Sequence, residues 1–120
     1  MVDADASHRE SLRSVLRAEG YRVLEATDYR SAENAHRVYL GQIDLLLTAL
    51  SLPGGNGYEL AKAFLNVEPG IKVLFVSGQA GAKVSEFYEI KPVLQRPFEP
   101  ADLLARVRSM LQSAKSSGAY

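Results

Sequence analysis

The chain has 120 residues, a length typical of one domain, and it has no cysteine, which excludes disulfides, thiolate metal sites and cysteine nucleophiles. Its 14 basic residues balance 14 acidic ones, which argues against a dedicated nucleic-acid or membrane surface, and no apolar run reaches the ~20 residues that span a bilayer. We therefore expect a soluble, cytoplasmic domain that contacts neither nucleic acid nor membrane directly.

The chain opens with one predicted helix and one predicted strand. Residues 7–19 place apolar side chains at helical spacing, and Ser7 followed by Glu10 fits a capping box. Gly20 is a suitable residue to end this helix. Residues 21–26 then have the character of a short strand.

The middle of the chain repeats this alternation. A second helix is predicted over residues 29–41, and the apolar run 44–50 predicts a buried strand. A loop rich in proline and glycine follows, and Asn56 is placed to cap a third helix over residues 57–67.

The last part of the chain contains two further strands. Residues 71–78 are almost continuously apolar and predict a strand, residues 79–90 suggest one short irregular helix, and residues 92–96 predict a short strand. Residues 99–112 form an amphipathic pattern with proline in the first turn. Residues 114–120 have the composition of a flexible tail or linker.

Strands that alternate with helices of this length indicate an α/β domain over residues 1–113, with a parallel sheet covered on both faces. The first strand is the exception, because only Met1 and Val2 precede Asp3. We expect either that only a stub forms or that the strand has been clipped. Apolar faces left open beside a stub would favour association with a second copy.

Small and polar residues follow the predicted strands, at ends that share one edge of a parallel sheet. In α/β sheets this edge is where ligands usually bind. One of these residues is Ala49, whose methyl group can neither donate, accept nor attack. The strand ends carry Asp3, Ala4 and Asp5; Thr48, Ala49 and Ser51; Ser77 and Gly78; and Arg96, Pro97 and Phe98.

The order and spacing of these strand ends resemble the receiver domain of bacterial two-component response regulators. The resemblance runs from Val2 to about Leu111 and is carried by the segments LLLTALSLPGGNG, VLFVSG, LQRPFEP and ADLLARVRSML. The combination of VLFVSG and LQRPF is most similar to receivers attached to hybrid sensor kinases.

The resemblance implies a flavodoxin-like, doubly wound five-stranded parallel sheet of order 2-1-3-4-5 with five helices. It implies a signalling module of a phosphorelay rather than an enzyme. The partners expected on this basis are a sensor kinase or an output domain, and a homodimer is among the assemblies expected.

In this family a phosphoryl group is transferred to an Asp that follows the third strand, beside a Mg²⁺ held by carboxylates. Here Ala49 occupies the phosphoacceptor position, and Ala4 occupies the second position of the acidic pair that would touch the metal. Mg²⁺ usually takes one or two carboxylates together with phosphate. We therefore expect Mg²⁺ binding to be weak or absent, with Asp3 and Asp5 as the residual ligands.

Other positions of this degenerate pocket keep more of the family pattern. Asp3 matches the first acidic position, Asp5 lies where many members carry Glu, Ser77 matches the hydroxyl, and Ser51 lies in the loop after the third strand. Arg96 replaces a Lys, which keeps the charge but changes a point charge to a planar fork. We expect Arg96 to pair with Asp3 or Asp5 or to turn to solvent, and the peptide bond after it to be cis.

Two explanations of the alanines remain open. The chain is either a natural pseudo-receiver that acts through protein contacts, or a phosphorylatable receiver whose Asp residues at 4 and 49 were replaced by engineering. A small-ligand-binding flavodoxin-like domain is a third reading, although no phosphate loop is visible. His8 and His36 each stand alone on a predicted helix, which favours structural roles over phosphorelay or metal binding.

Overall fold

The computed structural model describes residues 1–77, 93–95 and 98–118. Its centre is a three-stranded sheet of order β1-β4-β5, in which every pairing is parallel. The strands are β1 (Leu45–Ala49), β4 (Lys72–Ser77) and β5 (Val93–Gln95). This part of the predicted α/β architecture is confirmed.

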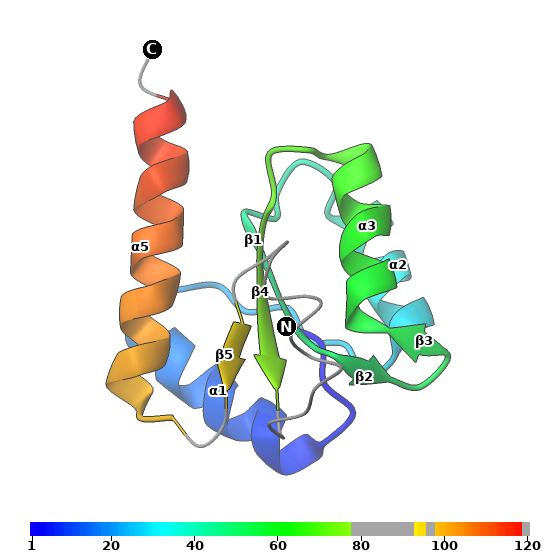
Figure 1. Cartoon of the computed structure of the whole chain (residues 1–120), viewed down its shortest axis with the longest axis horizontal. Helices are drawn as coiled ribbons and strands as arrows, with labels where there is room; N and C mark the ends of the chain where they lie inside the picture. Colours follow the sequence, from blue (N-terminus) through cyan, green and yellow to red (C-terminus); the bar gives the residue numbers. More distant parts are fainter. Residues whose placement is uncertain (78–92, 96–97, 119–120) are drawn as a thin grey trace.

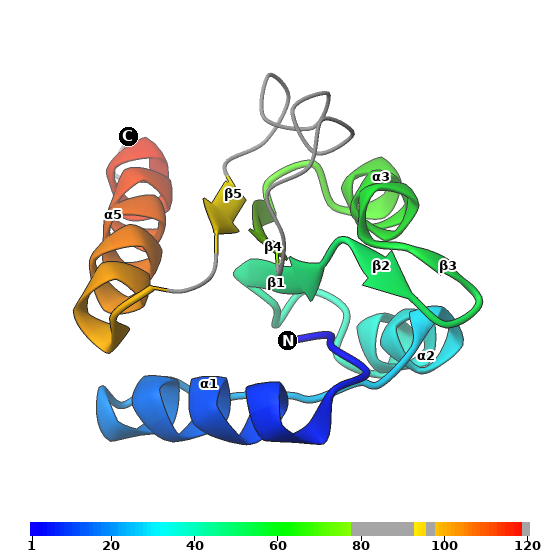
Figure 2. The same cartoon turned by 60° about the horizontal axis from the view of Figure 1, so that its bottom comes forward.

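Helices cover both faces of this sheet. Helices α1 (Ala6–Ala18) and α5 (Pro100–Gly118) lie on one side, and α2 (Tyr29–Val38) and α3 (Gly57–Val67) lie on the other (Figures 1 and 2). Helix α5 continues past the predicted end at residue 112, because no residue that breaks a helix occurs before Gly118. The predicted fourth helix, residues 79–90, lies outside the described residues.

The two-residue alternation of the strands explains why the sheet needs both helical layers. One set of strand side chains packs with α2 and α3, and the other packs with α1 and α5. The first set is Leu46, Val73 and Phe75, and the second is Leu47, Leu74, Val76 and Leu94.

The helix caps differ in part from the prediction. Asp5 caps α1 by accepting a hydrogen bond from the backbone N–H of His8 (3.0 Å), so the predicted capping box of Ser7 and Glu10 is wrong. The cap lies two residues before Ser7, because the carboxylate of Asp5 accepts from the otherwise unpaired backbone N–H of His8 in the first turn of α1. The predicted cap of α3 is confirmed, because Asn56 accepts from the Glu59 N–H (2.8 Å).

The first strand is indeed a stub. Val2 forms isolated parallel bridges to Ala26 and to Thr48, and residues 21–25 form no strand. The predicted strand over residues 21–26 is therefore wrong over most of its length. A strand forms where a neighbouring strand hydrogen-bonds to it over several residues. In this part of the chain, Val2 forms a bridge only with Ala26.

A small hairpin follows β1, where the sequence predicts only a loop. Strands β2 (Ser51–Leu52) and β3 (Gly55–Asn56) pair antiparallel, apart from the main sheet. Gly54 has φ of 82°, a conformation that glycine adopts after proline in tight turns. The hairpin carries the chain directly into α3.

The stability of the chain is expected to rise with pH between about 6 and 8. Burial of the Met1 α-amine lowers its pKa from 8.0 to about 6, and the nearby Glu25 carboxylate offsets this only in part. In this window the unfolded chain binds more protons than the folded chain, so folding is favoured as pH rises and this stability is lost as pH falls through the folded pKa.

The expected change is about 2.7 kcal/mol in the free energy of unfolding between pH values well below 6 and pH values well above 8. Urea denaturation at a series of pH values measures it. Nα-acetylation removes the titrating group and should flatten the profile by that amount, whereas superimposable profiles for the free and acetylated chains would contradict the prediction.

Candidate functional site

The candidate site is the carboxyl-terminal edge of the sheet, where Asp3 lies next to Ala49. The backbone N–H of Val2 donates to the Leu47 carbonyl (2.8 Å), and the Ala49 N–H donates to the Val2 carbonyl (2.9 Å). On the other side, the Asp3 N–H donates to the Ala26 carbonyl (3.1 Å). Backbone hydrogen bonds on both sides therefore fix Asp3 beside the end of β1.

Asp3 is buried, with 8% of the residue exposed, and its carboxylate has partners close by. Its Oδ1 accepts a hydrogen bond from the Asp5 backbone N–H (2.9 Å), and its Oδ2 lies 3.7 Å from Nδ1 of His8. The Asp3 carbonyl accepts from Nη1 of Arg9 (2.8 Å). Asp3 thus has the contacts of a residue that orders the start of α1.

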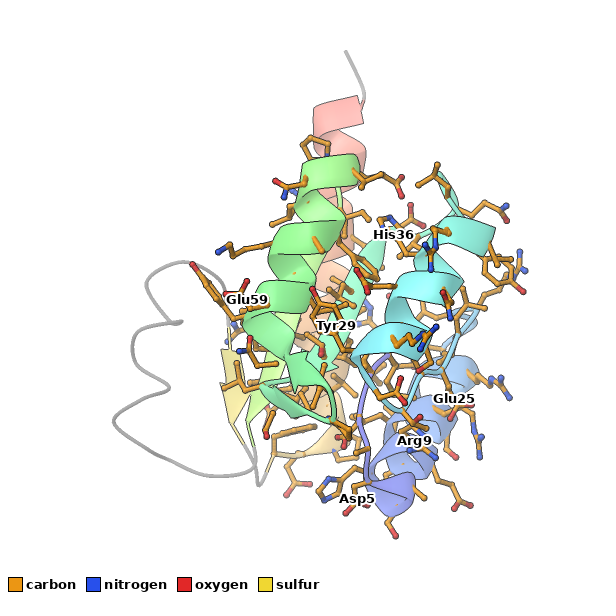
Figure 3. All side chains as sticks on the ribbon, turned by 90° about the vertical axis from the view of Figure 1, so that its right-hand side faces the viewer. Asp5, Arg9, Glu25, Tyr29, His36 and Glu59 are labelled. Atoms are coloured by element: carbon orange, nitrogen blue, oxygen red, sulfur yellow. The ribbon has the colours of Figure 1, made fainter. Side chains whose placement is uncertain are left out.

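Asp5 lies at the same edge and is exposed, but its carboxylate caps α1. Arg9 and Arg13, one turn apart on α1, both form ion pairs with the carboxylate of Glu25. The distances are 3.7 Å to Nε of Arg9 and 3.0 Å to Nη1 of Arg13. Figure 3 shows Asp5, Arg9 and Glu25 at this end of the molecule. The sequence alone does not predict the pairing of these arginines with Glu25, because only the fold brings Glu25 to α1.

Ala49 ends β1 and is half-buried. Its carbonyl accepts from the Thr48 hydroxyl (2.9 Å), and a Cβ built on Gly57 would lie 2.1 Å from the same oxygen. The Gly57 N–H donates to the Leu50 carbonyl (2.8 Å). The start of α3 is therefore held closely against the end of β1, and the only side chain that Ala49 offers there is a methyl group.

The remaining predicted positions are less closely gathered. Ala4 is exposed, and so is Ser51, which opens β2. Ser77 is the last residue of β4 and is paired with Gln95, but its side chain is not among the described ones. Arg96 and the peptide bond that follows it lie outside the described residues. The structure thus brings Asp3, Asp5 and Ala49 together.

His36 lies in a separate cluster between α2 and α3. Its Nε2 is 2.7 Å from Oε1 of Glu68, and its ring stacks on Phe64 with 4.0 Å between the centroids. The other oxygen of Glu68 accepts from the Gly41 N–H (3.1 Å). The burial and contacts of His36 are those of a residue that ties α2 to the end of α3.

The chemistry open to the described site is limited by its residues. Within residues 1–77, 93–95 and 98–118, no group of three or more His, Asp or Glu side chains is arranged to hold a metal ion. Asp3 and Asp5, the carboxylates at this edge, each already accept a backbone hydrogen bond at the start of α1. Among the described helices, none combines the length and the apolarity that crossing a bilayer requires.

Comparison with known proteins places the chain among similar sequences and folds. A family model described as response regulator receiver domain matches residues 1–108. The chain is 30% identical over 119 residues to the uncharacterized transcriptional regulatory protein YbdJ of Bacillus subtilis strain 168, covering 93% of this chain and 49% of YbdJ. It therefore spans about half the length of this and several other curated relatives.

Two solved structures are similar over nearly their whole length. One is a CheY-like response regulator receiver domain protein from Methanospirillum hungatei JF-1, with a TM-score of 0.84, 26% identity, and coverage of 97% of this chain and 94% of that one. The other is the receiver domain of the hybrid histidine kinase CckA, with a TM-score of 0.77, 31% identity, and coverage of 92% and 94%.

Proposed function

Since the chain belongs to the response regulator receiver domain family, we propose that it is a receiver that signals through protein contacts and forms no aspartyl phosphate. Receiver domains are signalling modules of response regulators and hybrid kinases, and the flavodoxin-like α/β fold of this chain is theirs. The partners proposed here are a sensor kinase or an output domain in the cytoplasm, or a second copy. Direct binding of nucleic acid is not part of the proposal.

The observation that carries this proposal is Ala49. It ends β1 at the edge where Asp3 lies, and its N–H is bonded to the Val2 carbonyl. A methyl group has no oxygen to which a phosphoryl group could be transferred. Asp44 cannot substitute, because its carbonyl accepts from the Lys72 N–H at the opposite end of β1, roughly 16 Å away at the usual rise of a strand.

The carboxylates support the same proposal. In a phosphorylatable receiver, Mg²⁺ would neutralise charge on the phosphoryl oxygens. With Ala4 exposed and without a carboxylate, Asp3 and Asp5 remain, and both already accept backbone hydrogen bonds. We infer that Mg²⁺ binds this edge weakly at most.

The strand order is part of the proposal. The doubly wound order 2-1-3-4-5 counts the stub at Val2 as strand 1, the segment that ends at Ala26 as strand 2, and β1, β4 and β5 as strands 3, 4 and 5. The pairing β1-β4-β5 and the two parallel bridges of Val2, to Ala26 and Thr48, support this order. A fourth helix between β4 and β5 would complete five helices.

Incubation with acetyl phosphate and Mg²⁺ should leave the unaltered chain without a phosphoryl adduct. Intact-mass spectrometry reads the result directly, because an acyl phosphate adds one phosphoryl mass and is lost at high pH. A phosphorylatable receiver treated in parallel shows that the reagent is active. An alkali-labile adduct on the unaltered chain would refute the proposal.

A further inference from the structure

Within the described residues, the large apolar side chains that are exposed all lie at one end of the α2–α3 layer. Val38 of α2 is 71% exposed, Leu40 just after α2 is 54% exposed, and Val67 at the end of α3 is 58% exposed. Apolar side chains that gather on the surface in this way are typical of an interaction site.

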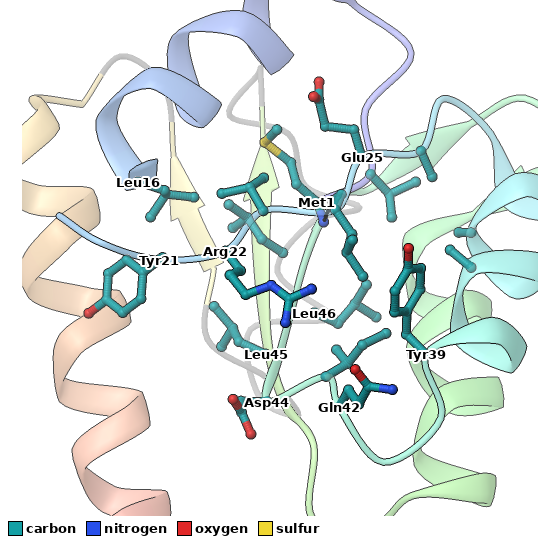
Figure 4. A pocket seen from close by; sticks show the side chains of 18 of the residues that line it. Met1, Leu16, Tyr21, Arg22, Glu25, Tyr39, Gln42, Asp44, Leu45 and Leu46 are labelled. Carbon is teal, nitrogen blue, oxygen red and sulfur yellow. Dashed lines mark hydrogen bonds between the residues drawn. The ribbon is translucent and has the colours of Figure 1, made fainter. Parts of the chain in front are cut away.

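The turn that ends α2 separates inward from outward side chains. Tyr39 lines the same pocket as Leu46 of β1 (Figure 4). Its two neighbours in the chain, Val38 and Leu40, are exposed. Packing in the core therefore uses Tyr39 and leaves the aliphatic side chains on either side of it at the surface.

Hydrogen bonds fix this turn against the end of α3. The Gly41 N–H donates to Oε2 of Glu68 (3.1 Å), and Oε1 of Glu68 lies 2.7 Å from Nε2 of His36. Because Gly41 follows Leu40 and Glu68 follows Val67, these contacts bring the two exposed side chains onto adjoining parts of one surface. That surface is ordered before any partner binds.

Positive charge runs along the outer side of α2 toward this end. Arg30, Asn34 and Arg37 are exposed and lie at positions i, i+4 and i+7, which share one side of a helix. Nη2 of Arg37 donates to Oδ1 of Asn34. The two arginines are about 10 Å apart along the helix axis. These three residues together with Val38 and Leu40 are called the α2 face below.

The charge of the α2 face is not paired within the part of the chain that the structure describes. No described carboxylate lies within ion-pair distance of Arg30 or Arg37. Asp28 is close in sequence, but its carboxylate caps α2, and its pKa is lowered first by hydrogen bonds with Ser31 and only last by the charge of Arg30. By contrast, three arginines of α1 and α5 do pair with glutamates: Arg9, Arg13 and Arg108.

We propose that the α2 face binds an amphipathic helix of a separate protein, which carries two carboxylates seven residues apart and apolar side chains on the same side. Carboxylates at this spacing match Arg30 and Arg37, because both helices rise by the same amount per residue. Arginine beside exposed aliphatic side chains is the composition of interface centres. A second copy would bring the same arginines toward one another, so the charge favours an acidic partner.

The helix dipoles give the partner a direction. The carboxyl-terminal end of α2 carries partial negative charge, and the amino-terminal end of a helix carries partial positive charge. An antiparallel partner therefore places its first turns beside Val38 and Leu40, and its apolar side chains are expected there. This inference rests on the proposed function only in naming a surface for its protein contacts.

The test uses the chain as it exists and a synthetic peptide, acetyl-ALLAAEAAKLAAEAAK-amide. In helical form this peptide presents its leucines and both glutamates on one side. Titration followed by amide chemical shifts should be saturable, with a dissociation constant of about 1 mM or below. The shifts should include Arg37, Val38 and Leu40. Added salt should weaken binding, because the charges involved are exposed.

Two control peptides separate shape from charge. A peptide of the same composition, with the leucines and glutamates distributed around the helix, should bind at least threefold more weakly. A peptide with both glutamates replaced by lysine should show no saturable shifts with the unaltered chain. Equal affinity of the rearranged peptide would overturn recognition of an amphipathic helix.

Protein variants test the location. Arg37→Glu should weaken binding of the acidic peptide at least tenfold, and Val38→Ser at least threefold; both positions are exposed, so the fold should be retained. Arg17→Glu is the matched control, because Arg17 is an exposed arginine in the last turn of α1, and it should bind as the unaltered chain does. The double variant Arg30→Glu with Arg37→Glu should bind the lysine peptide.

Three results would overturn the proposal. One is the absence of saturable shifts with the acidic peptide, and another is equal binding by the Arg37→Glu variant. The third comes from sedimentation velocity: if the chain self-associates and Val38→Ser abolishes this, the occupant of the α2 face is a second copy. None of these results depends on phosphoryl transfer, so the peptide titration and the acetyl phosphate experiment can fail independently.

Discussion

Ala4→Asp combined with Ala49→Asp is expected to turn a chain that takes up no phosphoryl group into one that acetyl phosphate and Mg²⁺ modify extensively. A carboxylate at position 49 would stand at the end of β1, whose backbone is fixed beside Val2 and Asp3. A carboxylate at position 4 would join Asp3 and Asp5 as an oxygen ligand of the type that Mg²⁺ prefers. Intact-mass spectrometry before and after alkali measures the adduct.

The single variants separate the acceptor from the metal site. Ala49→Asp alone should be phosphorylated on the order of a hundredfold more slowly than the double variant, because charge on the phosphoryl oxygens is poorly neutralised. Ala4→Asp alone should show no adduct. Ser51→Asp is the matched control, since it adds a carboxylate at an exposed residue just beyond the strand end, and it should also show none.

The double variant can also contradict this reading. If it takes up no phosphoryl group, the pocket has lost more than two carboxylates, and the replacement of the family's Lys by Arg96 would be the next position to change. Natural loss and engineered replacement predict the same result in this experiment. The gene sequence at codons 4 and 49 distinguishes them.

Gly57→Ala is expected to lower the free energy of unfolding by about 3 kcal/mol, near the upper end for overpacking of a close contact. The added Cβ would lie 2.1 Å from the Ala49 carbonyl oxygen and 3.2 Å from Cγ2 of Thr48. The oxygen belongs to the backbone of β1 and cannot swing aside as a side chain could. Relief of the clash therefore requires α3 to move away from the strand.

Gly70→Ala is the matched control for this prediction. A Cβ at Gly70 meets nothing within 4 Å, and Gly70 is not among the glycines with positive φ. Its free energy of unfolding should stay within about 0.5 kcal/mol of the unaltered chain. Urea denaturation of both variants measures the difference, and equal stabilities would show that the approach of Gly57 to Ala49 does not constrain the fold.

The sequence by itself predicted the features that depend on local periodicity. The apolar runs that became β1 and β4 indicated strands buried on both faces, and Asn56 was recognised as a helix cap because its side chain acts on a backbone group three residues away. The placement of Ala49 at a strand end followed from the same reading. These inferences succeed because the interactions involved lie within one element.

The features that the sequence did not predict depend on contacts between distant segments. Whether residues 21–26 form a strand depended on the bridges that Val2 makes, and the ion pairs of Arg9 and Arg13 depended on the position of Glu25. The approach of Gly57 to Ala49 likewise exists only once the layers are packed. Periodicity along the chain determined the elements and the place of Ala49 at a strand end, whereas tertiary packing decided which backbone edges and side chains meet, because those contacts join residues that no local pattern relates.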